Sequence, residues 1–344
     1  MHDPWKNRNT LLKMENVQVQ YRGAGGASKI IRNLDLALEK HQTLGIVGES
    51  GSGKTTLIRA VLGLLPPGGV ITGGRILFQG QDLLKLSREE RRRIRGRRIG
   101  MIFQEPGAAL NPVRKIGAQF SDALCAHFPM PKQEARQRAL DMLAKMLLPD
   151  PEKIFTSYSF QLSGGMKQRV TIALALALEP ELLLADEPTS ALDVTVQAQM
   201  IKEMQRLQQE LKTSIILVSH NMGVVAQMAD RIGVMYGGEL VEWGPKERVI
   251  NHPGHPYTKA LLSSIPRLDQ KERLLPSISG QPPRFGEMPR GCTFSPRCPE
   301  AVSICAPQSP GRFVDGWGHM VCCTKIKKGM GWTSYPTSKE AAGI

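Results

Sequence analysis

A glycine-rich loop between an apolar strand and a helix constrains the fold of this chain more than any other feature. The loop fits the pattern G-x-x-x-x-G-K-[ST] and reads Gly48-Glu-Ser-Gly-Ser-Gly53-Lys54-Thr55. We expect a strand over 43–47 before it and a helix over 54–65 after it. In such loops the backbone N–H groups surround phosphate oxygens, and the helix N-terminus adds a favourable dipole. Lys54 is therefore expected to bind the β- and γ-phosphates of a nucleotide, and the Thr55 hydroxyl to bind Mg²⁺.

A second apolar strand, about 130 residues after the loop, ends in two adjacent acids, Asp186 and Glu187. A carboxylate at the end of a buried strand can reach the Mg²⁺ shell, which is the role expected for Asp186. Glu187 then lies where a general base polarises the attacking water. By itself such a pair could equally cap a helix. After a phosphate-binding loop, it indicates the second half of a nucleotide site.

A third segment opens an Ala- and Leu-rich helix and reads Leu162-Ser163-Gly164-Gly165-Met166. Ser and Gly at the start of a helix offer free N–H groups and a hydroxyl, which together can bind a second phosphate. A simple capping turn would explain the same residues.

Short apolar strands alternate with helical segments over most of the chain. Strands are expected at 14–21, 43–47, 99–103, 182–185, 215–219 and 232–236, with longer helical segments at 106–148 and 194–211. This alternation predicts an α/β fold whose mainly parallel core sheet is covered by helices. No apolar run approaches the roughly 20 residues of a membrane-spanning helix, and no apolar signal segment begins the chain. We therefore expect a cytosolic protein.

The chain is basic, with 45 Lys and Arg against 31 Asp and Glu, a net charge of +14. Eight basic and two acidic residues fall within 85–98. Such a balance suits nucleic acid, a nucleotide or an anionic membrane surface. Only 5% of the residues are aromatic, and none interleaves with this run to stack on bases. A solvated, partly helical face is the interpretation we favour for it.

With these motifs, the chain resembles the ATP-binding subunits of ABC transporters over residues 11–250. Gln104 matches the Q-loop of that family, 190–193 its D-loop, and His220 its switch histidine. Tyr21 stands where the family stacks an aromatic ring on adenine. Two departures are LSGGM in place of LSGGQ, and Asn221 where Asp usually follows the histidine. The change to Asn221 could alter the loop that carries His220.

The resemblance implies an ABC ATPase domain over 1–250, with an antiparallel β subdomain and a helical subdomain over about 106–165. It implies that Glu187, His220 and Gln104 are catalytic and that Thr55, Gln104 and Asp186 bind Mg²⁺. The residues implied to contact ATP in the same subunit are Tyr21, Gly48, Ser50, Gly51, Ser52, Gly53, Lys54, Thr55, Thr56, Asp186 and Asp193. Ser163, Gly164 and Gly165 are implied to contact the ATP that the partner subunit holds.

Three further motifs resemble the peptide and nickel importers within that family. They are the Q-loop extension over 104–112, His255-Pro-Tyr-Thr258, and Gly291-Cys-Thr-Phe-Ser-Pro-Arg-Cys-Pro299. This finer resemblance implies a C-terminal extension over 251–324, followed by a flexible tail over 325–344. It also implies peptide uptake, or uptake of a related solute such as nickel complexes, at the cytoplasmic face of the cell membrane. The implied partners are a second, different ABC ATPase, two permease subunits and an extracytoplasmic solute-binding protein.

The extension is rich in proline and cysteine, with eight prolines in 276–310 and five of the six cysteines in 292–323. Proline at this density argues against long helices and central strands, so the segment is either disordered or held by something other than a core. The resemblance implies a [4Fe–4S] cluster on Cys292, Cys298, Cys305 and Cys323, with Cys322 as the alternative fourth ligand. The spacings lack the C-x2-C pair of many zinc sites, which weakens a zinc site. Unmetallated thiols or disulfides are the third possibility, and Cys125 is expected to be a small buried residue.

Three other functions compete with the importer. An ABC-type ATPase that acts on nucleic acid or ribosomes without a permease would suit the +14 charge, but such proteins generally carry two ATPase cores or long coiled coils. A purely regulatory nucleotide binder would not need Glu187 and His220. An exporter would often carry its own membrane domain. We therefore expect an importer subunit and no nucleic acid.

Overall fold

The computed structural model describes residues 9–23, 26–190, 193–265, 277–283, 285–326, 328–329 and 331–335. These residues form two compact units. The first unit takes its residues from 1–39, 43–85 and 219–344, and the second from 40–42 and 86–218.

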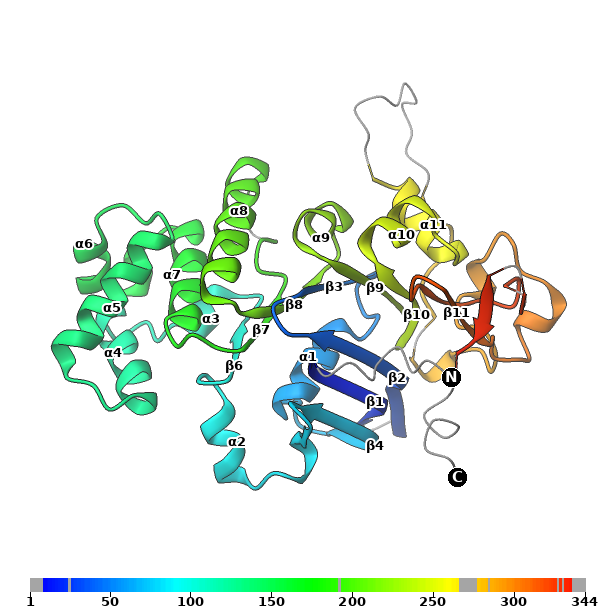
Figure 1. Ribbon diagram of the computed structural model, residues 1–344, viewed down its shortest axis with the longest axis horizontal. Helices are drawn as coiled ribbons and strands as arrows, with labels where there is room; N and C mark the ends of the chain where they lie inside the picture. The colour runs from blue at the N-terminus through cyan, green and yellow to red at the C-terminus, as the bar shows by residue number, and fades with distance from the viewer. Residues whose placement is uncertain are drawn as a thin grey trace. The chain divides into compact units, whose positions relative to one another are not determined.

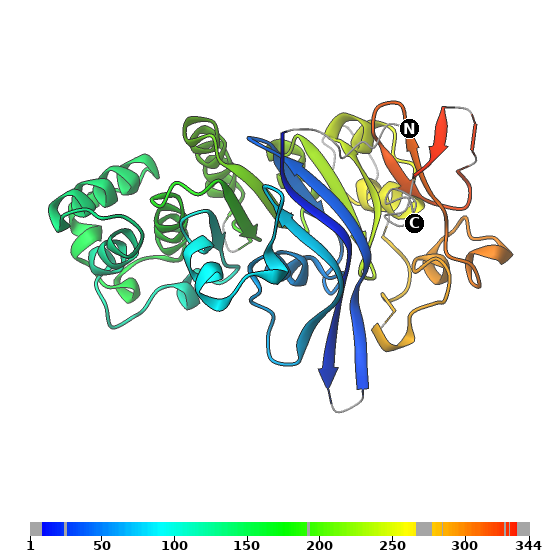
Figure 2. The ribbon, with the colours of Figure 1, turned by 60° about the horizontal axis from the view of Figure 1, so that its bottom comes forward.

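The first unit contains a four-stranded antiparallel sheet near the N-terminus. Its strand order is β2-β1-β4-β5, with β1 (Thr10–Gly23), β2 (Gly26–Glu39), β4 (Gly69–Phe78) and β5 (Gln81–Asp82). The long strands β1 and β2 run side by side (Figure 2). Leu12 and Met14 are buried because every second residue of a strand faces the same side. The register of β1 shifts between Met14 and Val17, and the alternation resumes with Val17 and Val19, which are also buried.

The same unit holds six strands of a second, mixed sheet. They follow the order β13-β11-β12-β10-β9-β3, and only β3 and β9 pair in parallel. Their bounds are β3 (Thr43–Val47), β9 (Arg231–Tyr236), β10 (Glu239–Pro245), β11 (Arg312–Asp315), β12 (Met320–Cys322) and β13 (Trp332–Ser334). The helices of this unit are α1 (Lys54–Leu62), α9 (Met222–Met228), α10 (Lys246–Asn251) and α11 (Pro256–Ser263), with 3₁₀ turns at Leu83–Lys85, Phe285–Glu287, Ser295–Arg297 and Ser303–Cys305.

The segment expected to form a C-terminal extension thus continues the mixed sheet of the first unit, because β12 pairs with β10. The expected tail from residue 325 is also partly structured, since Trp332–Ser334 pairs with β11. Residues 336–344, where we also expected a flexible tail, lie outside the described residues.

The second unit combines three parallel strands with a cluster of helices. The strand order is β8-β7-β6, with β6 (Ile99–Ile102), β7 (Leu182–Asp186) and β8 (Ser214–Ser219). Helices α4, α5 and α6 lie together (Figure 1). The helices are α2 (Arg88–Ile94), α3 (Pro106–Ala109), α4 (Ile116–His127), α5 (Lys132–Lys145), α6 (Pro151–Thr156), α7 (Gly164–Leu176) and α8 (Val194–Leu211), with a 3₁₀ turn at Ser159–Gln161. The predicted α/β fold, with an antiparallel β part and a helical part, is confirmed.

Two local expectations for this unit can be compared with the structure. Cys125, on α4, is exposed rather than buried. In the basic run, Ser87 and Glu90 form a capping box at the start of α2, and Arg92 pairs with Glu89 at 2.9 Å. These contacts support the interpretation of the run as a solvated helix face. Among the described residues, no helix is long and apolar enough to cross a membrane.

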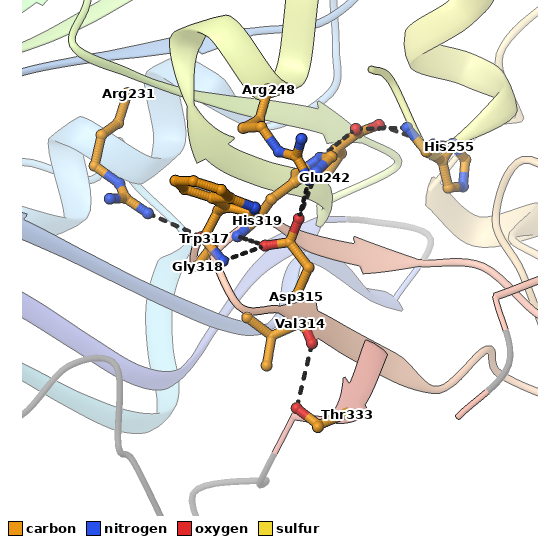
Figure 3. Close-up of polar contacts among 11 residues, drawn as sticks. Arg231, Glu242, Arg248, His255, Val314, Asp315, Trp317, Gly318, His319 and Thr333 are labelled. Atoms are coloured by element: carbon orange, nitrogen blue, oxygen red, sulfur yellow. Dashed lines mark hydrogen bonds and ion pairs between the residues drawn. The ribbon is translucent and has the colours of Figure 1, made fainter. Parts of the chain in front are cut away.

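A buried carboxylate joins the extension to the core of the first unit (Figure 3). Glu242, on β10, has 0% of its surface exposed, and His319 has 1%. One Glu242 oxygen lies 2.7 Å from His319 Nε2 and accepts the Gly254 N–H at 2.8 Å. The other accepts the His255 N–H at 2.9 Å. Each carboxylate oxygen is therefore hydrogen-bonded, as burial of a charge requires.

A second acid continues this network toward α10. Asp315 accepts the N–H groups of Trp317 and His319 at 2.9 Å each, and Arg248 binds its other oxygen at 2.7 Å (Figure 3). The two acids together fix the β11–β12 turn and the start of α11.

Removing the His319 imidazole should destabilise the protein, because Glu242 would lose one buried partner. We expect His319→Ala to lower the free energy of unfolding by about 1 to 3 kcal/mol, the usual cost of an unsatisfied buried polar group. Thermal unfolding measures this as a lower Tm. The matched control is Arg92→Gln on exposed α2, which should leave Tm unchanged. An unchanged Tm for His319→Ala would contradict this assignment.

Candidate nucleotide-binding site

The glycine-rich loop connects β3 to α1 through backbone that tolerates little substitution. Gly53, directly before α1, has φ 102°, a left-handed conformation that favours glycine. At Gly48 a Cβ atom would lie 2.1 Å from the backbone oxygen of Met235, so no side chain fits there. Gly53 thus allows the left-handed turn into α1, and Gly48 allows the close approach of the Met235 backbone.

Lys54 lies at the centre of this loop and is buried. Its Nζ donates to the carbonyl oxygens of Gly48 at 2.8 Å and of Glu49 at 2.9 Å. Ser52 and Thr56 are also buried, Thr55 is half-buried, and Ser50 and Gly51 are exposed. The structure therefore places a cation inside the loop whose N–H groups are expected to surround phosphate.

Tyr21 lies beside the first turns of α1. Its hydroxyl oxygen is 3.0 Å from Thr56 Oγ1. Its ring also lies against Gly69 of β4, where a Cβ would come within 2.6 Å of it. The expected stacking of this ring on adenine stays a prediction, made at a position that borders the loop helix.

His220 directly follows β8 and is exposed. The next residue, Asn221, caps α9 because its Oδ1 accepts the N–H groups of Gly223 at 2.9 Å and Val224 at 3.4 Å. Asn is as good a helix cap as Asp. The departure from the family pattern thus preserves the turn that carries the histidine.

In the second unit, Gln104 and the two acids lie around the end of β7. Asp186 is its last residue and is 1% exposed. Glu187 follows with φ 46°, and its N–H donates to Val218 O at 2.9 Å. Gln104 Nε2 donates to Glu187 Oε2 at 3.3 Å, so the structure brings these two predicted catalytic residues together.

The left-handed backbone of Glu187 was not apparent from the sequence. A non-glycine residue in this conformation costs on the order of 1 kcal/mol or more, and such residues cluster at functional sites. Proline follows Glu187 in the sequence, but nothing in that pair predicts a positive φ.

Two further predicted ATP contacts are helix caps. Ser163 caps the 13-residue α7, accepting the Met166 N–H at 3.3 Å, and Gly164 is exposed beside it. Asp193 caps α8, accepting the N–H groups of Thr195 and Val196. Residues 191–192 of the predicted D-loop lie outside the described residues. Capping and phosphate binding are compatible at α7, and the phosphate contact of 163–165 stays a prediction.

Four cysteines of the extension line one pocket, namely Cys292, Cys298, Cys305 and Cys323. Cys322 lies in β12 and is buried elsewhere, with its Sγ 3.4 Å from Leu240 O. All six thiols of the chain are free of disulfides.

Burial raises the pKa of the Cys292 thiol to about 11 and that of Cys322 to about 12. Among the described residues, no three His, Cys, Asp or Glu side chains are arranged to hold a single metal ion.

Comparison with known proteins agrees with the fold and the motifs. Residues 31–190 match the ABC transporter family model, and residues 241–305 match that of the oligopeptide/dipeptide transporter C-terminal region. A dipeptide transport ATP-binding protein of Bacillus subtilis, DppD, is 45% identical over 91% of this chain and 94% of its own length. The oligopeptide transport ATP-binding protein OppD of Haemophilus influenzae is 44% identical over 86% of this chain and 92% of its own.

Among solved structures, the dimeric ATP-binding cassette MJ0796 with ADP and Pi aligns with a TM-score of 0.63 and 28% identity. It covers 69% of this chain and 99% of its own. Identity above 40% over most of the length, together with the matched extension, places this chain in the family of ATP-binding subunits of oligopeptide/dipeptide ABC transporters.

Proposed function

We propose that this chain hydrolyses ATP to power the import of peptides through separate permease subunits. The observation that carries the proposal is the pairing of Gln104 with Glu187 at the end of β7, in a chain that also holds Lys54 inside a phosphate-binding loop. Lys54 would bind the phosphates, and Thr55, Gln104 and Asp186 would hold Mg²⁺, which would neutralise charge on the phosphates. Glu187 polarises the attacking water. His220 orients the γ-phosphate and this water. Peptides are preferred to nickel complexes as cargo because the relatives carry peptide-transport names.

The distribution of motifs supports a dimer of ATPases. One chain carries one phosphate-binding loop and one Ser163–Gly165 segment, and the similar cassette MJ0796 is dimeric. We infer head-to-tail pairing, in which each ATP lies between the loop of one subunit and the serine-glycine segment of the other. The proposed partner is a different ABC ATPase, and the pair docks on two permeases at the cytoplasmic face of the membrane. A solute-binding protein outside the membrane would deliver the peptide.

ATP drives such an assembly through its preference for one state. If ATP binds the closed dimer more tightly than the open one, it shifts the population toward the closed dimer and the permease conformation coupled to it. Hydrolysis removes that preference and resets the pair.

Glu187→Gln tests the proposed base. The amide keeps the shape of the side chain but cannot accept a proton, so we expect ATP hydrolysis to fall by about 10² to 10⁴ while ATP binding is retained. ATP should then trap the closed dimer, which site-specific cross-linking between the phosphate-binding loop of one subunit and the Ser163–Gly165 segment of the other detects in the purified complex.

The control is Glu181→Gln, at the other end of β7, where Glu181 pairs with Arg98 at 2.6 Å. This change should leave turnover near the wild-type rate. Undiminished hydrolysis by the Glu187 variant would remove that residue from its proposed role.

The cysteine pocket supports a [4Fe–4S] cluster as the finer part of this proposal. In such a cluster each cysteine binds a different iron, so the four thiolates need not converge on one point as they would around zinc. The four pocket cysteines fit that donor set, with Cys323 rather than Cys322 as the fourth ligand. When bound, the cluster would supply covalent cross-links between the 292–305 segment and residue 323. It would thus hold together a segment that is too rich in proline to form its own core.

Serine substitutions separate the two adjacent cysteines. Protein purified anaerobically should contain iron and sulfide in about equal amounts and absorb broadly near the visible range. Cys323→Ser should lose most of this iron, whereas Cys322→Ser and the exposed control Cys125→Ser should keep it. Colourless, iron-free wild-type protein would contradict the cluster, and equal loss from both neighbours would contradict the choice of Cys323.

A further inference from the structure

The second residue of the phosphate-binding loop, Glu49, is held by two residues of the C-terminal extension. The Glu49 N–H donates to the hydroxyl oxygen of Tyr257, on α11, at 2.9 Å. The Glu49 carboxylate accepts both terminal nitrogens of Arg297, at 2.6 and 3.0 Å. Backbone and side chain of one loop residue are thus fixed by residues more than 200 positions away.

Arg297 is itself rigidly placed. Its side chain is 5% exposed, and its nitrogens also donate to the carbonyl oxygens of Ile278 at 3.2 Å and Ser279 at 2.9 Å. A further hydrogen bond of 3.2 Å joins it to the Tyr236 hydroxyl. The hydrogen bond to Glu49 raises the pKa of Arg297 further above its usual range. A bidentate arginine–carboxylate pair of this kind fixes geometry as well as charge.

Tyr257 is anchored by an aromatic cluster. It is fully buried, and its ring centroid lies 4.7 Å from that of Tyr236 and 5.3 Å from that of Phe294. His255 caps α11 by accepting the Tyr257 N–H at Nδ1, at 3.1 Å. Burial lowers the pKa of His255 to about 4, so the ring is neutral and able to accept. The hydroxyl that meets Glu49 therefore has little freedom to move.

The contacts continue from Glu49 to the centre of the loop. The Glu49 carbonyl is one of the two that bind Lys54 Nζ. The extension also shares a pocket with the loop, whose lining includes Ser50, Gly51 and Ser52 together with Pro282, Pro283 and Met288. A shift of Glu49 would thus displace both the loop backbone and the lysine expected to bind phosphate.

We propose that Arg297 and Tyr257 are positioning residues for ATP: by clamping Glu49, they hold the loop in the conformation that receives phosphate. The C-terminal extension is then part of the nucleotide site. This inference rests on the proposed ATPase function. Arg297 directly precedes Cys298, so the segment that lines the cysteine pocket also carries the clamp.

The test measures the Kd of the full-length chain for a fluorescent ATP analogue, together with Tm. Arg297→Gln should raise Kd about tenfold, since a charge-assisted bidentate contact is lost. The Kd of Arg297→Lys should fall between those of the wild type and Arg297→Gln, because lysine keeps the charge but not the bidentate geometry. Tyr257→Phe removes only the oxygen that meets Glu49 and should raise Kd by a smaller factor.

The matched control is Arg312→Gln. Arg312, on β11, forms an ion pair with Asp35 of β2 and so also joins the extension to the core of the first unit, but it does not touch the loop. This variant should keep Kd within about twofold of the wild type, even where Tm falls as far as in Arg297→Gln.

Non-additivity separates positioning from general destabilisation. Glu49→Gln should also raise Kd. The Kd of the double variant Arg297→Gln/Glu49→Gln should be no higher than the higher Kd of the two single variants, because all three variants lack the same ion pair. Should Arg297→Gln fail to fold, Arg297→Lys and Glu49→Gln carry the same comparison.

Two results would overturn the clamp: wild-type Kd in Arg297→Gln, or equal weakening by Arg312→Gln. Failure of the wild-type chain to bind ATP at all would instead contradict the ATPase function on which the clamp rests. The two failures are therefore distinguishable.

Discussion

The turn from β3 into α1 is the constraint on which the rest of the structure depends. A strand that is buried along its whole length must become a helix within six residues, and backbone N–H groups must stay available for phosphate. Glycine meets this demand where the backbone is left-handed, at Gly53, and where Met235 approaches, at Gly48. Such a loop is poorly able to hold its own shape. The conformation of the loop is therefore held by the hydrogen bonds of Lys54 and by contacts with the C-terminal extension.

The extension meets that need through buried polar and aromatic contacts. Glu242 and His319 tie its strands to β10, and the ring of Tyr257 packs with Tyr236 of β9. These contacts join residues that are far apart in the sequence, so the segment folds as a continuation of the ATPase core. Phe294, within the proline-rich stretch, also packs against Tyr236, with 5.2 Å between the ring centroids, so contacts with β9 help to order this part of the extension.

Much of the site follows from local sequence, because phosphate binding needs particular residues at fixed spacing. The loop around Lys54, the acids at the end of β7 and the cap at Ser163 all belong to such local patterns. The clamp on Glu49 does not, because Arg297 lies 248 residues away and no local pattern joins the two. The positive φ of Glu187 depends equally on its surroundings. Cys322 and Cys323 are adjacent in sequence, and only the position of β12 separates the buried thiol from the one in the pocket.

ATP hydrolysis by this chain is proposed to serve peptide import. The most direct measurement is the ATPase rate of the complete complex, purified with its permeases and reconstituted in lipid vesicles. We expect the rate to rise when solute-binding protein loaded with peptide is added, and DNA or RNA to have no effect. A rate that ignores the loaded binding protein, or that responds to nucleic acid instead, would contradict it.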